Sequence, residues 1–204
     1  MYGMTLELQN ISKSFDGLPV LRNLNLSFHQ GQCYCLMSPS GSGKTTLLRI
    51  LMGLEQPDQG MVLAGGKPQD MNSLTVSAVF QEDRLCENLS TEANIRLVQK
   101  GGKGRSRDFL QQLQDGFSAV GLEGWGKRPV KELSGGMKRR AALLRALYAD
   151  WNILLLDEPF KGLDRETKDK VLAFVREKCR GKTVLCVTHE KEEAEILGAE
   201  ILEL

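Results

Sequence analysis

The sequence predicts an α/β fold: a mostly parallel sheet flanked by helices, an N-terminal antiparallel β subdomain and an inserted helical lobe. Three patterns support this. Apolar residues alternate with polar ones before residue 30, as in half-exposed antiparallel strands. A glycine-rich turn near residue 41 joins an apolar run to a helical pattern. Beyond residue 150, short apolar strands alternate with helices, which is typical of parallel sheets covered by helices.

The N-terminal half contains the antiparallel part and the glycine-rich turn. Alternating apolar positions at Leu6, Leu8, and again from Leu24 to Phe28, predict half-exposed strands that pair antiparallel. The apolar run 33–37 ends in the turn, and apolar positions at helical spacing follow over 47–51. We expect two further strands at 61–63 and 76–80.

The middle of the chain differs from the rest. Leu110, Leu113, Phe117 and Val120 keep a helical spacing. We therefore expect residues 84–133 to form a helical subdomain, inserted into one core made of 1–83 and 134–204. After it the predicted elements are a strand at 153–156, a helix at 165–180, a strand at 183–187 and a helix at 190–197.

Composition bounds the possible functions. The 204 residues are 41% hydrophobic and 26% charged, which fits one compact soluble domain, 1–204. The formal net charge of +1 gives no general attraction to nucleic acid, and we expect no such partner. The five cysteines form no C-x-x-C pair, so we expect core thiols in a reducing compartment.

Membrane and export signals are not expected either. The N-terminus lacks a basic segment followed by an apolar core, so we expect no signal peptide. No apolar run approaches the ~18 residues that span a bilayer. Any membrane role would therefore come through a partner.

The segment Ser38-Pro-Ser-Gly-Ser-Gly-Lys44-Thr-Thr46 has the features of a phosphate-binding loop. Its glycines let successive N–H groups point inward, and the following helix adds the positive end of its dipole. Lys44 supplies a cation for the outer phosphates of ATP, Thr45 a hydroxyl for Mg²⁺, and Thr46 a donor to an inner phosphate. The loop residues that we expect to bind nucleotide are Ser40, Gly41, Ser42, Gly43, Lys44, Thr45 and Thr46.

Ser38 occupies the position where the usual pattern has glycine. Serine fits there if its φ is negative. The alternative to a phosphate loop is an ordinary glycine-rich turn before a helix, which the strand–turn–helix context disfavours.

Asp157 and Glu158 follow the apolar run 153–156. In a parallel sheet the carboxyl ends of the strands converge where ligands bind. Asp157 suits a Mg²⁺ ion and Glu158 suits an attacking water. A charged turn after a strand is the alternative, and the phosphate loop argues against it.

The sequence Leu133-Ser134-Gly135-Gly136 precedes a helical stretch, which we expect over 138–149. Ser134 could simply cap that helix. Alternatively, Ser134 and bare N–H groups form a second anion site. One terminal phosphate cannot easily meet two helix starts of one chain, so a second chain would offer this site.

These motifs together resemble the nucleotide-binding subunits of ABC transporters, of the importer type. The family's order is kept over nearly the whole chain: the loop at 38–46, Gln81, Leu-Ser-Gly-Gly at 133–136, Leu-Leu-Leu-Asp-Glu-Pro at 154–159, Gly-Leu-Asp at 162–164, and His189. The resemblance implies a P-loop NTPase core. Met137 and the pair Lys161-Gly162 depart from the commoner residues at their positions.

The resemblance also implies roles for individual residues. Phe15 would stack on adenine, Gln81 would contact Mg²⁺ or water, and His189 would reach the terminal phosphate. Ser134 and Gly136 would close over ATP held by a second protomer. The catalytic set implied is Glu158, His189, Lys44 and Gln81, and the Mg²⁺ ligands are Thr45, Gln81 and Asp157; Asp164 would help to assemble the dimer.

The implied function is ATP binding and hydrolysis by a homodimer that sandwiches two ATP molecules. Hydrolysis would power solute transport through separate transmembrane permease subunits, with a solute-binding protein, at the inner face of the cell membrane. The segment 80–85 resembles importers of small anions such as nitrate and sulfonates. A soluble ATPase of the same superfamily, acting in cluster assembly or repair with non-membrane partners, is the alternative.

Overall fold

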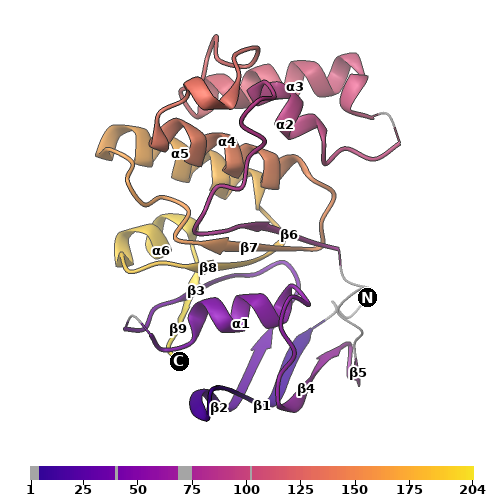
Figure 1. Ribbon diagram of the computed structural model, residues 1–204, viewed down its shortest axis with the longest axis vertical. Coiled ribbons are helices and arrows are strands. Elements are labelled where there is room, and N and C mark those ends of the chain that lie inside the picture. Colours follow the sequence, from indigo (N-terminus) through magenta and orange to yellow (C-terminus); the bar gives the residue numbers. More distant parts are fainter. Residues whose placement is uncertain (1–4, 40, 69–74, 102) are drawn as a thin grey trace.

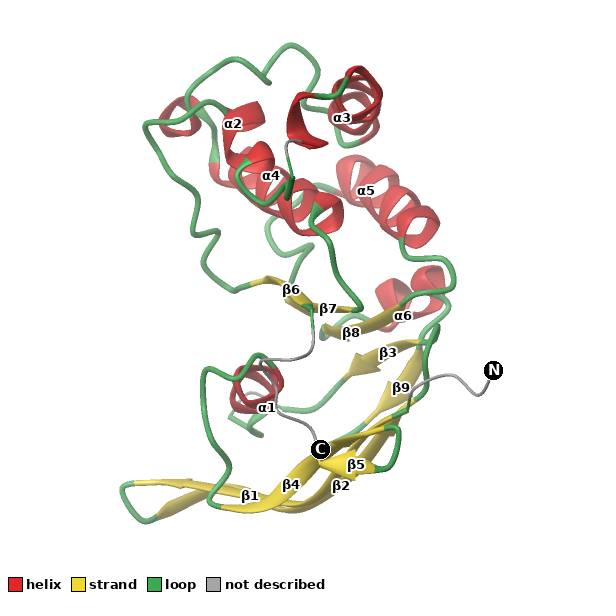
Figure 2. Ribbon diagram, turned by 90° about the vertical axis from the view of Figure 1, so that its right-hand side faces the viewer, coloured by secondary structure: helices red, strands yellow, loops and turns green. Residues whose placement is uncertain are grey.

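The computed structural model describes residues 5–39, 41–68, 75–101 and 103–204, and these form two sheets with helices between and above them. Figures 1 and 2 show the layers: an antiparallel sheet, the single helix α1 (Lys44–Leu51), a parallel sheet, and a layer of helices. This confirms the predicted fold class.

The antiparallel sheet has the strand order β2-β1-β4-β5. Its strands are β1 (Leu6–Phe15), β2 (Leu18–Phe28), β4 (Gln59–Ala64) and β5 (Lys67–Pro68). Asp16 and Gly17 link β1 to β2 with φ values of +50° and +76°, the signs that a two-residue hairpin turn requires. Leu8 lies opposite Leu26 on one side and Val62 on the other, so the predicted antiparallel pairing is confirmed.

The parallel sheet has the strand order β6-β7-β8-β3-β9. Its strands are β3 (Cys33–Leu36), β6 (Val76–Val79), β7 (Ile153–Asp157), β8 (Thr183–Val187) and β9 (Glu200–Leu202). All neighbouring pairs run parallel. In register, Leu36 pairs with Val187, and Val187 with Asp157. The segments that follow β3, β6, β7 and β8 therefore leave the sheet along one edge.

The two faces of this sheet belong to two hydrophobic cores. Alternate residues such as Tyr34, Leu155 and Leu185 pack with α1 and the antiparallel sheet. Their neighbours, such as Leu154 and Cys186, pack with the helical layer. Since side chains of a strand alternate between faces, both faces of a buried parallel strand must be apolar, as observed.

The helical layer consists of five helices and two short 3₁₀ turns within the described residues. They are α2 (Thr91–Arg96), α3 (Arg107–Ala119), α4 (Gly135–Tyr148), α5 (Arg165–Lys178), α6 (Lys191–Leu197) and the turns Lys103–Arg105 and Val130–Glu132. The core is continuous from Phe117 of α3 to Leu156 of β7. The division into a core and an insertion at 84–133 stays a prediction.

Helix α4 begins earlier than the sequence predicts. We expected the helix to start near Lys138, yet the glycines at 135 and 136 already belong to its first turn. The reason is the cap: Ser134 Oγ accepts a hydrogen bond from the Met137 N–H at 3.4 Å, which offsets the low helix propensity of glycine.

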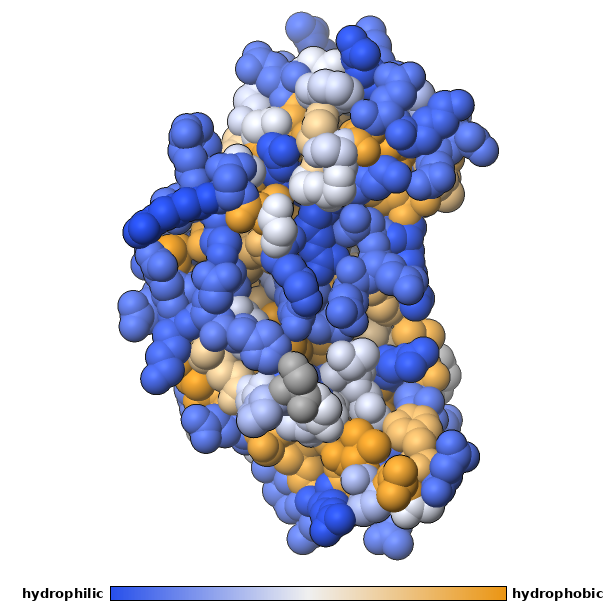
Figure 3. Space-filling model, turned by 60° about the vertical axis from the view of Figure 1, so that its left-hand side comes forward, coloured by the Kyte–Doolittle hydropathy of each residue, from blue (hydrophilic) through white to orange (hydrophobic). Residues whose placement is uncertain are grey.

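The surface is mainly hydrophilic across the middle of the face in Figure 3, and hydrophobic residues show mostly in its lower part. Exposed large side chains of the antiparallel sheet include Leu18 and Met61, which are 72% and 50% exposed. Among the described residues, no helix combines the length and the apolar character that crossing a bilayer demands.

Candidate functional site

A pocket of about 330 Å³ opens at the carboxyl edge of the parallel sheet. Its lining comes from β2, the turn after β3, the start of α1, and the ends of β6, β7 and β8. The lining residues are Val20, Gly41, Gly43, Lys44, Thr45, Thr46, Gln81, Asp157, Glu158, Val187 and His189. Most residues that the sequence singled out as loop, metal or catalytic candidates therefore meet in one cavity; the valines Val20 and Val187 were not predicted.

The turn into α1 is built on two glycines with positive φ, +84° at Gly41 and +92° at Gly43. At Gly43 there is also no room: a Cβ atom would lie 2.6 Å from Leu21 Cδ2 and 3.0 Å from Val20 O. Gly43 is the N-cap of α1 and has no side chain to accept from the helix's first N–H groups, and the first turn carries no acidic residue. This helix start is therefore suited to an anion.

Lys44 lies across the same turn and is only 6% exposed. Its Nζ donates to the carbonyls of Ser38 and Pro39 at 2.5 and 2.8 Å, and lies 3.4 Å from Ser42 Oγ. Neutral carbonyls do not balance the ammonium charge, and the Asp157 carboxylate interacts with that charge only weakly. An anionic group in the pocket would supply that balance.

Ser38 is accommodated without strain where the usual pattern has glycine. Its φ is not positive. Its Oγ accepts a hydrogen bond of 2.7 Å from the backbone N–H of Leu204, next to β9. The serine thus ties the turn to the end of the neighbouring strand segment.

Thr45 and Asp157 both line the pocket and are in contact, with Thr45 Oγ1 donating to Asp157 Oδ2 at 3.2 Å. Burial raises the pKa of Asp157, while the Thr45 hydrogen bond opposes that rise. A hydroxyl and a carboxylate this close fit two neighbouring positions of a Mg²⁺ shell, whose ligands lie ~2.1 Å from the ion. The described residues hold no group of three or more His, Cys, Asp or Glu side chains placed for a metal. Besides Gln81, which lines the same pocket, phosphate and water oxygens would complete the shell.

Glu158 has an unusual backbone. Its φ of +47° lies in the left-handed region, which costs a non-glycine residue about 1–2 kcal/mol. Its Oε1 lies 3.2 Å from His189 Nε2, and its Oε2 lies 2.5 Å from Lys161 Nζ. The Lys161 contact is the main reason why the pKa of Glu158 is lowered, and His189 adds to it.

Arg139 is a further site residue that sequence reasoning missed. Its guanidinium is buried and donates to the carbonyls of Asp157 and Glu158, both at 2.6 Å. It also donates to the carbonyl of Phe80, and to that of Gln81 at 3.4 Å. Arg139 therefore joins α4, the segment after β6 and the end of β7. The only signal in the sequence was a basic residue five positions after Ser134, and this position does not indicate which groups it contacts.

Other predicted site residues lie outside this pocket. Phe15 is 41% exposed at the end of β1, with Lys13 Nζ 5.3 Å from its ring centroid. Ser134 caps α4 and is exposed, and neither it nor Gly136 lines the pocket. Asp164 caps α5 by accepting from the Thr167 N–H at 3.0 Å. Ser42 contacts Lys44 without lining the cavity, and the prediction for Ser40 falls outside the described residues.

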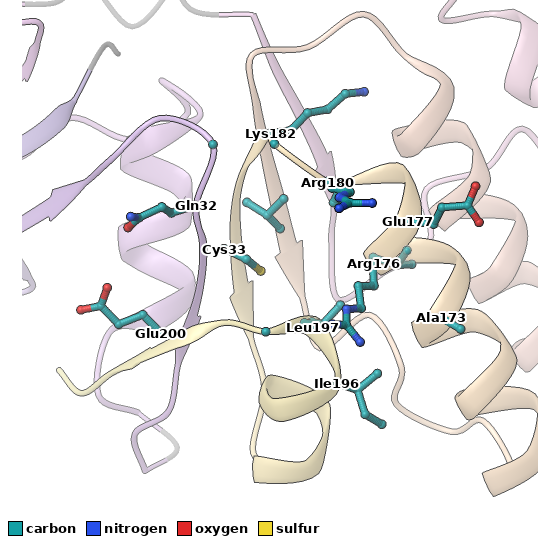
Figure 4. A pocket seen from close by; sticks show the side chains of 16 residues that line it. Gln32, Cys33, Ala173, Arg176, Glu177, Arg180, Lys182, Ile196, Leu197 and Glu200 are labelled. Carbon is teal, nitrogen blue, oxygen red and sulfur yellow. The ribbon is translucent and has the colours of Figure 1, made fainter. Parts of the chain in front are cut away.

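A larger hollow of about 930 Å³ lies at the opposite ends of the strands (Figure 4). It is bordered by the ends of α5 and α6, with Arg176, Arg180 and Lys182 among its residues. Cys33 also lines it, and burial raises the pKa of that thiol to about 12. None of the predicted site residues that the structure describes lines this hollow, so size alone does not identify the functional site.

Comparison with known proteins gives a family match over most of the chain. Residues 21–161 match the profile of the ABC transporter family. A sulfate/thiosulfate import ATP-binding protein, CysA of Synechocystis, is 36% identical over 98% of this chain. A spermidine/putrescine import ATP-binding protein, PotA of Spiroplasma citri, is 39% identical over 97%. A Fe(3+) ions import ATP-binding protein, FbpC of Rhizobium etli, is 39% identical over 91%.

The chain spans only part of these relatives, 58%, 58% and 54% of their lengths. Among solved structures, a dimeric ATP-binding cassette in a post-hydrolysis state with ADP and Pi superimposes with a TM-score of 0.83. It is 27% identical, and the match covers 98% of this chain and 94% of that one. A dimeric bacterial ABC transporter cassette gives the same TM-score at 28% identity, with the same coverage of both chains.

Proposed function

This chain belongs to the ABC transporter family, and we propose that it is the subunit that binds and hydrolyses ATP to drive an importer. The observation that carries the proposal is the pocket at the sheet edge that holds most of the predicted site residues. There the helix start with Lys44, the Thr45–Asp157 pair, and Glu158 beside His189 face the same space.

Phosphate binding follows from the turn and from α1. The N–H groups of the helix start and the Lys44 ammonium face the pocket and hold the outer phosphates of ATP. Thr45, Asp157 and Gln81 hold Mg²⁺. When bound, the ion neutralises charge on the phosphate oxygens. Asp157 and Thr45 already lie at hydrogen-bond distance, so their positions need little change on binding.

Hydrolysis depends on Glu158 and His189. The carboxylate orients a water molecule toward the terminal phosphate and accepts its proton, a role typically worth ~10²–10⁴ in rate. His189 lies on the pocket side of the carboxylate and reaches toward the same phosphate. Arg139 holds the carbonyls of residues 157 and 158 and fixes the strand end that carries both acids.

The second half of each nucleotide site comes from a second copy of the chain. Ser134 and Gly136 lie at the start of α4 but do not reach the pocket of their own chain. In a two-fold dimer they close over the ATP of the partner. The dimeric cassettes with TM-scores of 0.83 support this arrangement. Phe15 lies exposed at the end of β1 opposite Leu18 of β2, the strand that also carries the pocket residue Val20, and stacks on adenine.

Transport requires separate membrane subunits. The relatives named as import ATP-binding proteins support this assignment over a soluble ATPase for cluster assembly or repair. We therefore place the chain on the inner face of the cell membrane, docked on a permease that works with a solute-binding protein. Those relatives are named for sulfate, polyamine and iron import, so they leave the solute open; the segment 80–85 favours a small anion.

Two substitutions test the proposal. Glu158→Gln should lower ATP turnover at least about a hundredfold while ATP still binds. Lys44→Ala should weaken ATP binding itself, because it removes the cation of the cradle. ATP turnover is measured with an isothermal enzyme assay and ATP affinity by equilibrium titration, both on the same preparations. Wild-type turnover in the first variant, or unchanged affinity in the second, would refute the assigned roles.

A further inference from the structure

Both oxygens of the Glu158 carboxylate are occupied, and by groups on different sides. His189 Nε2 contacts Oε1 at 3.2 Å, and His189 lines the pocket. Lys161 Nζ contacts Oε2 at 2.5 Å, and Lys161 does not line the pocket. One oxygen is thus directed toward the nucleotide space and the other is held from outside it.

The contact with Lys161 is set by the local backbone. Glu158 has φ +47° and Gly162 has φ +78°, and the Lys161 N–H donates to the Glu158 carbonyl at 3.3 Å. These features make a tight turn that brings residue i+3 over residue i. Asp164 ends the turn by capping α5. The ion pair therefore forms within one chain and needs neither nucleotide nor a second protomer.

The two partners differ in exposure. The Lys161 side chain is 66% exposed, whereas that of Glu158 is 18% exposed. An ammonium at the end of an exposed, flexible stem can move to solvent or to another anion at small cost. The carboxylate, in contrast, stays at the pocket wall.

We propose that Lys161 is a positioning residue that restrains Glu158 in the chain without nucleotide, keeping one carboxylate oxygen away from the water it must orient. This proposal rests on the proposed role of Glu158 in hydrolysis. Closure of the dimer around ATP places phosphate charge beside the pair, and the ammonium leaves the carboxylate. Lys161 thereby limits ATP turnover by the purified protein, because the ion pair must break at each closure before the carboxylate can orient water.

The expected effect is modest because one partner is exposed. Ion pairs of this kind contribute little, so we expect release of Glu158 to raise kcat about two- to fivefold. The effect should fall on kcat rather than on KM, because Lys161 lies outside the pocket that holds ATP. The rise in kcat should also disappear when the Glu158 carboxylate is absent.

The test compares ATP turnover of the purified wild-type chain with that of five variants, three of which keep Glu158. Lys161→Met should raise kcat about two- to fivefold, with KM within about twofold of the wild-type value. Lys161→Arg keeps the cation and should stay near wild type. Lys170→Met is the matched control, because Lys170 Nζ pairs with Glu166 at 2.7 Å, is 62% exposed, and lies away from the pocket; it should change nothing.

The fourth and fifth variants, Glu158→Gln with and without Lys161→Met, separate this proposal from the proposed function. In a Glu158→Gln background, Lys161→Met should have no further effect. A kcat for Lys161→Met at or below the wild-type value, or a rise that persists without the carboxylate, would overturn the restraint. If Glu158→Gln alone turns over like wild type, the proposed function fails instead.

Discussion

Replacing Arg139 with methionine removes a buried guanidinium and keeps a long side chain of similar reach. The carbonyls of Asp157 and Glu158 thereby lose the hydrogen bonds of 2.6 Å that the guanidinium donates to them. It also frees the carbonyls of Phe80 and Gln81 and the carboxylate of Asp83, which is 3.2 Å from Nη1.

The magnitude follows from burial. Hydrogen bonds to a charged group are worth ~1.5–3 kcal/mol each, but they are not additive when one group makes several. Asp83 is 24% exposed, so water can replace part of its contact. Breaking a buried charged network by removing one partner typically costs ~3–5 kcal/mol. We therefore expect Arg139→Met to lower the free energy of unfolding by about 3–5 kcal/mol, or Tm by about 6–20 °C for a chain of this size.

The assay is guanidinium chloride unfolding followed by tryptophan fluorescence, together with ATP turnover. Arg145→Met is the matched control, because Arg145 also lies on α4 and donates to two carbonyls, those of Arg84 and Asp83, at 2.8 and 3.1 Å. It should cost about 1–2 kcal/mol and leave turnover nearly unchanged. If Arg139→Met stays within about 1 kcal/mol of wild type, the guanidinium does not hold these segments together.

Two further predictions concern the turn and the thiols. Gly43→Ala should lower ATP affinity at least about tenfold more than Gly41→Ala does. Both positions have positive φ, but only a Cβ at position 43 would meet other atoms. Equal losses of ATP affinity in a titration would contradict the tight turn. At pH 8 an alkylating reagent should label the exposed Cys86 and spare Cys33 and Cys179 in the folded chain. Burial raises the pKa of Cys33 and Cys179 to about 12. At pH 8 the reactive thiolate is therefore about 10⁻⁴ of each thiol, and this fraction grows only as the pH rises toward 12. Mass spectrometry that shows all three cysteines labelled at equal rates would refute this prediction.

Much of the fold could be predicted because its signals are local. The apolar runs of the parallel strands end in the residues that line the pocket, such as Asp157 after 153–156. The rule that parallel strands end at one edge then places Gln81, Asp157 and His189 together. Gly41 and Gly43 likewise indicate positive φ values in the turn. The roles of these residues remain predictions.

The contacts of Arg139 and Lys161 could not be predicted from the sequence. Arg139 reaches carbonyl groups, and a carbonyl occurs at every residue, so no sequence pattern identifies its partners. Lys161 meets Glu158 in a turn whose backbone at 158 adopts a left-handed φ, which is rare for glutamate. The early start of α4 was missed for a related reason: the glycine pair reads as a turn, whereas the Ser134 cap makes it helical.

The central claim is that the turn at 41–46 wraps the phosphates of a nucleotide with Glu158 beside the terminal one. A crystal structure of the Glu158→Gln variant with Mg-ATP tests it most directly. The account predicts phosphates on Lys44 and the first N–H groups of α1, position 158 next to the terminal phosphate, and Ser134 of a second chain closing the site. An empty pocket at this edge, or ATP bound only in the larger hollow at the opposite ends of the strands, would contradict it.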